Sequence, residues 1–176
     1  MTNIITSVLN QVKKKVTCQE NYVLAAYEWL KPVPGGLRLL SKVVSRKAPY
    51  FQTVDPIIQK LERNYCEAIM SKNRTVMSKN RTVENHIGTV HVIAICNGLE
   101  FVMGVLTEAS IPAHLRWLPK GMQVNYVAKS NSDIKLIARV EDEWKAGDLN
   151  VTIEAYREDG TIVVQGTIML WVTEKK

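Results

Sequence analysis

The longest apolar stretch of the chain covers residues 92–106, where nearly every side chain is hydrophobic. A helix that is apolar on all sides is a buried one. These 15 residues fall short of the roughly 20 that a bilayer requires, so we predict a core helix. Asn97 and Glu100 interrupt it three positions apart and therefore share a face. Because a carboxylate rarely enters a core without a function, this face marks a candidate site.

Four segments after this helix alternate apolar and polar positions, the pattern of strands with one buried face. They are residues 122–128, 134–140, 149–155 and 162–172. Turn-forming residues separate them at 130–133, 145–148 and 158–160. Short turns between alternating strands predict an antiparallel meander.

The segment before the helix is also strand-like. Residues 57–69 alternate well enough for one long strand or two short ones, and residues 50–54 look extended. The order is strand, buried helix, four strands. It predicts an α+β fold in which one helix is wrapped by a curved antiparallel sheet. We place this domain at residues 49–176 and assign residues 1–48 to a helical extension.

The net positive charge lies in the N-terminal part of the chain. Residues 1–50 hold eight Lys or Arg and two acidic residues, whereas the rest of the chain, whose total is +6, is balanced. Residues 4–31 read as two helical pieces, a Pro- and Gly-rich breaker follows, and residues 37–46 have helical spacing. The polar side of that last helix is basic: it carries Arg38, Lys42, Arg46 and Lys47.

A basic amphipathic helix is most often a solvated face. The functional alternatives are contact with an anionic membrane, which we rank below the solvated face, or with a phosphorylated ligand. No nucleic acid is expected, because no aromatic residue interleaves the basic positions. The composition, 46% hydrophobic and 23% charged, excludes wholesale disorder.

Two further features bear on organisation. The heptapeptide Met-Ser-Lys-Asn-Arg-Thr-Val occurs at residues 70–76 and again at 77–83. An odd insertion inverts the faces of a strand, so we predict that one copy stays in register and the other loops out. The cysteines Cys18, Cys66 and Cys96 lack metal-ligand spacing, and the N-terminus lacks the order of a signal peptide. Both indicate a cytoplasmic protein with reduced thiols.

The residues around the start of the core helix form a motif. Asn85, Gly88, Thr89 and His91 precede it, and Glu100 follows nine positions after His91. From residue 50 to residue 172 the chain resembles the PaaI-like acyl-CoA thioesterases of the hotdog superfamily. It is closer still to an uncharacterised branch that carries Asn-His-x-Gly-Thr-x-His. This resemblance implies the hotdog fold, with its long helix held in a curved sheet.

The resemblance also implies roles for these residues. Glu100 would act as nucleophile or general base, Asn85 and His91 would orient the thioester or a water, and Asn97 could hold the Glu100 carboxylate. The remaining predicted contacts are with substrate: Gly88, Thr89 and the backbone donors near Val92 and Ile93. Metals and prosthetic groups are not implied. Hotdog sites form between protomers, so a homodimer or dimer of dimers that hydrolyses acyl-CoA or another acyl thioester is expected.

One departure keeps a second hypothesis open. The family has Gly-Gly after the histidine, where this chain has Val92 and Ile93. Glycine lets a carbonyl approach the backbone, and β-branched side chains crowd that approach. The alternative is therefore a hotdog protein that binds acyl-CoA or a fatty acyl chain without cleaving it. A hydratase ranks last, because its Asp and His pair is not found.

Overall fold

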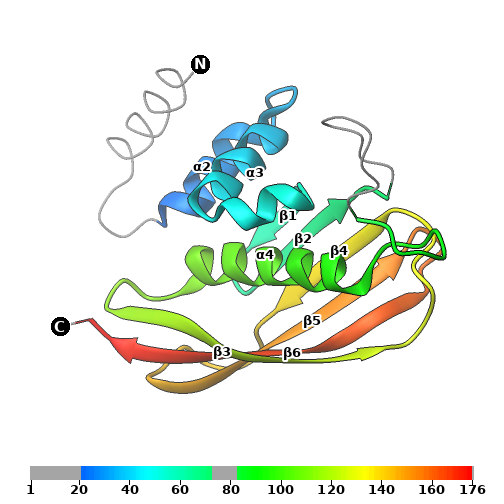
Figure 1. The fold of residues 1–176 in the computed structure, drawn as a ribbon. Coiled ribbons are helices and arrows are strands. Elements are labelled where there is room, and N and C mark those ends of the chain that lie inside the picture. The colour runs from blue at the N-terminus through cyan, green and yellow to red at the C-terminus, as the bar shows by residue number, and fades with distance from the viewer. Residues whose placement is uncertain (1–20, 73–82, 176) are drawn as a thin grey trace.

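The computed structural model describes residues 21–72 and 83–175. Two helices and a 3-10 turn precede a hairpin, a long helix and four more strands (Figure 1). The elements are α2 (Tyr22–Leu30), α3 (Gly36–Lys47), η1 (Pro49–Thr53), β1 (Ile57–Glu62), β2 (Tyr65–Met70), α4 (Val92–Ser110), β3 (Leu115–Tyr126), β4 (Ile134–Arg139), β5 (Gly147–Arg157) and β6 (Ile162–Glu174).

The strands form one six-stranded sheet in the order β1-β2-β4-β5-β6-β3, and every neighbouring pair is antiparallel. The sheet curves around α4, which confirms the predicted α+β architecture (Figure 1). Residues 57–69 are two strands, joined by a turn in which Asn64 has a φ of 62°. The predicted meander is right for β4, β5 and β6 and wrong for β3. That strand pairs with β6 at the far edge, with Val124 opposite Gly166.

The predicted core helix is confirmed, and it extends to Ser110. Its 19 residues are long and apolar enough to cross a membrane, but most of its side chains are buried inside the protein. Gly98 allows close packing on the sheet, because a Cβ there would lie 2.6 Å from Leu136 Cδ1. The expectation that α4 has no solvated face is wrong. Only one side of the helix lies on the sheet, and Ile93, Cys96 and Glu100 are exposed or half-exposed on another.

The N-terminal helices pack beside α4 and β1. Asn21 caps α2 by accepting from the backbone N–H groups of Val23 and Leu24. The predicted basic amphipathic helix is α3, whose buried Ser41 accepts a hydrogen bond from Ile58 N at 2.9 Å. The domain boundary at residue 48 remains a prediction.

Three predictions for the first half of the chain are not confirmed: one is wrong, and two concern residues outside the described part. Residues 50–54 are not extended, because Pro49 at the first position begins the 3-10 turn η1. The predicted helical piece before residue 21 lies outside the described residues. Most of the repeated heptapeptide, residues 73–82, lies outside them as well.

Candidate active site

Three of the predicted site residues build the turn that leads into α4. Asn85 Oδ1 accepts from the backbone N–H groups of Ile87 and Thr89, each at 3.1 Å, and Asn85 Nδ2 donates to Thr89 Oγ1 at 2.8 Å. Gly88 has a φ of 73°, a left-handed conformation that favours glycine. The side chain of Asn85 therefore makes its hydrogen bonds within the turn. Asn85, Gly88 and Thr89 position the helix start.

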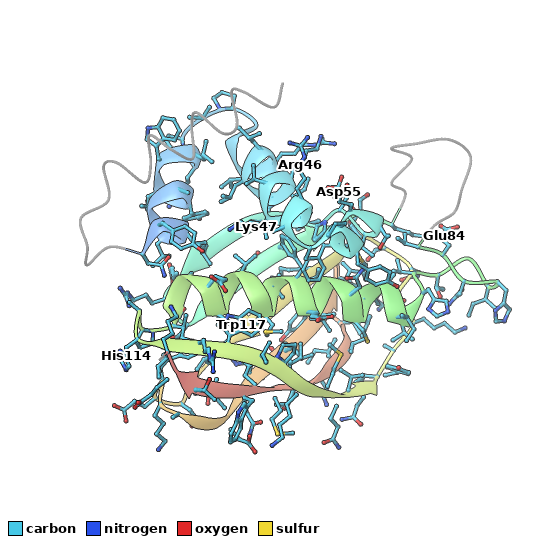
Figure 2. The ribbon with its side chains drawn as sticks, turned by 60° about the vertical axis from the view of Figure 1, so that its left-hand side comes forward. Arg46, Lys47, Asp55, Glu84, His114 and Trp117 are labelled. Carbon is cyan, nitrogen blue, oxygen red and sulfur yellow. The ribbon has the colours of Figure 1, made fainter. Side chains whose placement is uncertain are left out.

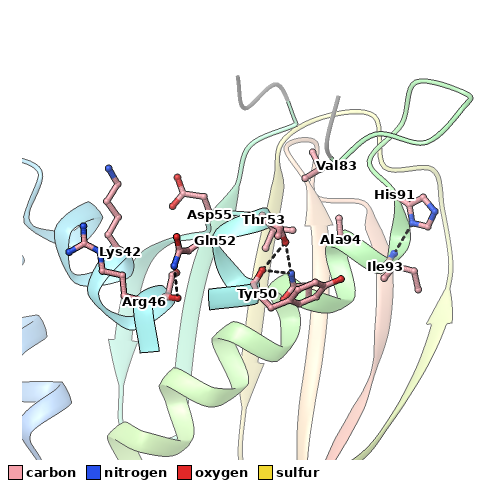
Figure 3. Close-up of a pocket in the computed structure, with 13 residues that line it drawn as sticks. Lys42, Arg46, Tyr50, Gln52, Thr53, Asp55, Val83, His91, Ile93 and Ala94 are labelled. Atoms are coloured by element: carbon pink, nitrogen blue, oxygen red, sulfur yellow. Dashed lines mark hydrogen bonds between the residues drawn. The ribbon is translucent and has the colours of Figure 1, made fainter. Parts of the chain in front are cut away.

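His91 is the N-cap residue of α4. Its side-chain Nδ1 accepts a hydrogen bond from the Ile93 N–H at 3.2 Å (Figure 3), and its backbone N–H donates to Val83 O at 2.6 Å. Because Nδ1 accepts, the neutral ring carries its proton on Nε2. The exposed His91 side chain thus keeps one N–H donor for a ligand.

The hydrogen bonds of the first turn decide which backbone donors remain. The Ile93 N–H is taken by His91 Nδ1, and the Ala94 N–H donates to His91 O at 2.9 Å. The Val92 N–H has no partner among residues 21–72 and 83–175. Of the two predicted oxyanion donors, only Val92 has a free N–H. The positive end of the helix dipole lies at the same place.

A groove of about 900 Å³ lies beside this helix start, between α3, η1 and the first turns of α4 (Figure 3). Its wall along α4 consists of His91, Ile93, Ala94 and Asn97. Tyr50 and Thr53 line it from η1. Sequence reasoning missed the η1 residues because it read this segment as a strand.

Asn97 joins α4 to η1. Its Nδ2 donates to Tyr50 O at 3.3 Å and to Thr53 Oγ1 at 3.1 Å, and only 6% of the residue is exposed. Asn97 Oδ1 has no hydrogen-bond partner in the described part of the chain. The amide thus holds the groove wall, and makes no hydrogen bond to Glu100.

Glu100 lies one turn beyond Asn97 and outside the groove lining. The side chain is half-buried and forms no hydrogen bond or ion pair with any residue that the structure describes. It belongs to the stripe of α4 that also carries Ile93 and Cys96. Trp117 of β3 lies over Gly104 on the same helix, so the stripe runs between the groove and β3 (Figure 2). The structure therefore gives Glu100 an unpaired carboxylate on an incompletely covered surface.

The edge strand β3 is open. Among the described strands it pairs only with β6, and its apolar residues are exposed: Leu118 by 68%, Met122 by 38% and Tyr126 by 61%. The prediction that residues 122–128 bury one face is wrong within one chain. A long apolar edge strand invites pairing with another strand.

The chain matches one protein family and several solved structures. Residues 36–172 match the family described as "Domain of unknown function (DUF4442)". Among solved structures, the structural-genomics protein APC5556 is 33% identical with a TM-score of 0.72, over 88% of this chain and 99% of that one. A search of curated proteins finds no match.

Two more distant structures are named for an activity. A Pseudomonas aeruginosa protein of unknown function, described as a probable thioesterase, is 19% identical with a TM-score of 0.67, over 81% of this chain and 97% of that one. A thioesterase from Haemophilus influenzae is 13% identical with a TM-score of 0.63, over 78% of this chain and 90% of that one. At these identities the likeness shows the shared fold.

Proposed function

The chain belongs to the DUF4442 family and has the hotdog fold, and from this premise we propose that it hydrolyses acyl thioesters, with acyl-CoA as the substrate class. The observation that carries the proposal is Glu100. It is a carboxylate on the core helix without a partner among the described residues, beside a groove that leads to a helix N-terminus. An unpaired, half-buried carboxylate does not stabilise the fold, whereas a general base needs a carboxylate that is free to accept a proton.

The chemistry assigns one role to each end of the site. The Glu100 carboxylate takes a proton from water as that water attacks the thioester carbonyl. His91 Nε2–H and the Val92 N–H stabilise the oxyanion that forms. Collapse of this intermediate breaks the C–S bond, and the proton held by Glu100 passes to the leaving thiolate. The products are a carboxylic acid and a free thiol.

One chain does not bring these groups together. His91 and Glu100 are nine residues apart, which at about 1.5 Å per residue separates them by about 13 Å along the axis of α4 and places them on opposite sides. We therefore propose a homodimer in which Glu100 of one protomer faces the helix start of its partner. The open edge of β3 and the exposed stripe of α4 support this arrangement.

Sedimentation of the purified protein tests the dimer. The wild type is expected to sediment at twice the mass of the chain or more, and Tyr126→Lys on the β3 edge is expected to shift it toward the monomer. Lys129→Ala just beyond β3 serves as a control for a charge change there. A monomeric wild type would refute the shared site.

A second function, binding without cleavage, has one observation in its favour. Because His91 Nδ1 takes the Ile93 N–H, the first turn of α4 offers one free backbone donor. The oxyanion hole would then depend on the exposed His91 side chain for its second donor.

An assay of thiol release separates the two functions. The purified chain is incubated with thioesters from acetyl-CoA to palmitoyl-CoA, and binding of the same compounds is measured by calorimetry. Hydrolysis above the rate in buffer supports the thioesterase. Binding of acyl-CoA with no hydrolysis at any chain length would reject it in favour of the binding protein.

A further inference from the structure

The groove has a second end, on α3, to which the proposed chemistry assigns nothing. Lys42 and Arg46 lie four residues apart on one face of α3, and both line the groove (Figure 3). Both are exposed, and Arg46 projects outward from the helix (Figure 2). Neither side chain has a hydrogen bond, ion pair or ring contact with another described residue.

Several other cations of the described chain are paired. Lys120 binds Asp148 at 2.8 Å and Arg157 binds Asp159 at 2.6 Å. Lys47, the residue after Arg46, lies 5.7 Å from the centre of the Tyr22 ring. Two adjacent unpaired cations on the wall of a groove form a site for a group with more than one negative charge.

The wall between the cations and α4 contains unsatisfied polar atoms. Ser45, one residue before Arg46, is 1% exposed, and its Oγ has no hydrogen-bond partner in the described part of the chain. Asn97 Oδ1, on α4, has none either. Buried polar atoms without partners are rare in proteins. Both residues belong to the lining of the same groove, so polar groups lie along its wall between the cations and α4.

The remaining lining restricts the ligand further. Val54, Val83 and Ala94 give the groove apolar surface, and Asp55 is its acidic residue. Asp55 already takes part in another interaction. The groove thus offers positive charge on α3, polar atoms beyond it and apolar surface near α4. A linear ligand with a phosphate, amide groups and a short apolar segment matches this order.

We propose that Lys42 and Arg46 form a phosphate-binding subsite that holds the carrier arm of the acyl thioester. The amides of the arm lie along Ser45 and Asn97, and its sulfur end points toward α4. This inference rests on the proposed function and adds to it the residues that select the carrier. The phosphate is either that of the pantetheine arm or one on the nucleotide of CoA.

Kinetics with two substrates test the subsite. The double variant Lys42→Ala, Arg46→Ala is compared with wild type on acyl-CoA and on the same acyl group attached to N-acetylcysteamine, which has no phosphate. The KM for acyl-CoA is expected to rise at least tenfold with little change in kcat. The KM for the phosphate-free thioester is expected to stay the same. A rise on both substrates, or on neither, would overturn the proposal.

A matched control separates local from general charge effects. Arg63 and Lys145 are exposed, have no partners among the described residues and lie at the opposite end of α4. Arg63→Ala, Lys145→Ala removes the same two charges. This variant is expected to keep the wild-type KM for acyl-CoA, and a rise equal to that of the α3 variant would count against the subsite.

Binding of CoA itself keeps the subsite testable if no thioester is cleaved. Calorimetry is expected to give a Kd for CoA at least tenfold weaker in the α3 variant than in wild type. Competition then distinguishes the phosphates: 4′-phosphopantetheine displaces CoA if the arm's phosphate is bound, and 3′,5′-ADP does so if the nucleotide's is. An unchanged Kd, or displacement by neither compound, would refute the inference whatever the outcome for hydrolysis.

Discussion

Asn97 Nδ2 donates a hydrogen bond to Thr53 Oγ1 over 3.1 Å and so joins residues that are 44 positions apart. Asn97 belongs to the core helix α4, and Thr53 ends the 3-10 turn η1. The bond fixes one wall of the groove to the element that the whole sheet surrounds. Stability and the shape of the site are therefore linked through this amide.

Asn97→Ala is expected to lower the free energy of unfolding by about 1–3 kcal/mol, because it removes both bonds to η1 and leaves Tyr50 O without one of its donors. Thr53→Val keeps the bond from Asn97 Nδ2 to Tyr50 O but removes two others, the one that Thr53 Oγ1 accepts from Asn97 and the one that it donates to Tyr50 O at 2.7 Å. A similar loss of about 1–3 kcal/mol is therefore expected. Urea denaturation measures both variants. Equal stability of wild type and Asn97→Ala would show that η1 is held by other contacts.

His91 caps α4 and is also proposed to donate a hydrogen bond to the substrate. Two substitutions separate these roles. His91→Asn keeps a side-chain acceptor for the Ile93 N–H but removes the Nε2–H. It is expected to stay close to wild-type stability and lose activity. His91→Ala is expected to lose activity and also about 1 kcal/mol of stability. Thermal unfolding and thiol release are the two measurements, and an active His91→Asn would leave the histidine with capping alone.

Gly166 allows β3 to approach β6. A Cβ at this position would collide with Gln123 O and the Val124 backbone. Gly166→Ala is therefore expected to destabilise the protein by about 2–3 kcal/mol and to weaken any association through β3. Gly121 on β3 has open space around the corresponding point, so Gly121→Ala is the control and is expected to be tolerated. Similar denaturation midpoints for both variants would contradict the assigned packing.

Glu154 makes stability depend on pH. Arg139 donates to both of its carboxylate oxygens, at 2.6 and 3.0 Å, and Tyr156 donates at 2.7 Å. The bond to Arg139 is the main reason that the pKa of Glu154 lies below its ordinary value of 4.5, and the bond from Tyr156 acts in the same direction. A depressed folded-state pKa stabilises the protein fully above the unfolded-state pKa, and the effect disappears as pH falls through the folded-state pKa.

Glu154→Gln tests this dependence. At neutral pH the variant is expected to be less stable by about 1–2 kcal/mol. The difference from wild type is expected to shrink as the pH falls below 4.5, the ordinary pKa of the group. Denaturant unfolding at a series of pH values gives the curve, and a difference that stays constant into the acid range would contradict the linkage.

The local pattern of apolar and polar positions predicted the helices and strands well, but it predicted the order of the strands in the sheet poorly. The apolar run of α4 and the alternation of β4 to β6 depend on which face is buried, which periodicity reports directly. Periodicity does not report which strand lies beside which, so the pairing of β3 with β6 was missed. Nor does mean hydropathy show a narrow exposed stripe, and for that reason Glu100 was expected in a fully buried setting.

The candidate site divides in the same way. The cap position of His91 follows from its place just before an apolar run. The partners of Asn97 lie 44 and 47 positions away in η1 and are not encoded in any local spacing. Lys42 and Arg46 were recognised as a basic face of a helix. Only the fold places that face on the groove of α4.

The central claim, that the carboxylate on α4 drives thioester cleavage, is tested most directly by the kcat/KM of Glu100→Gln for acyl-CoA. The matched control is Glu108→Gln on the same helix, where glutamine still accepts the bond from Trp117 Nε1. The account predicts that Glu100→Gln lowers kcat/KM by a factor of about 100 or more while CoA still binds, and that the control retains activity. Hydrolysis by Glu100→Gln at the wild-type rate would contradict it.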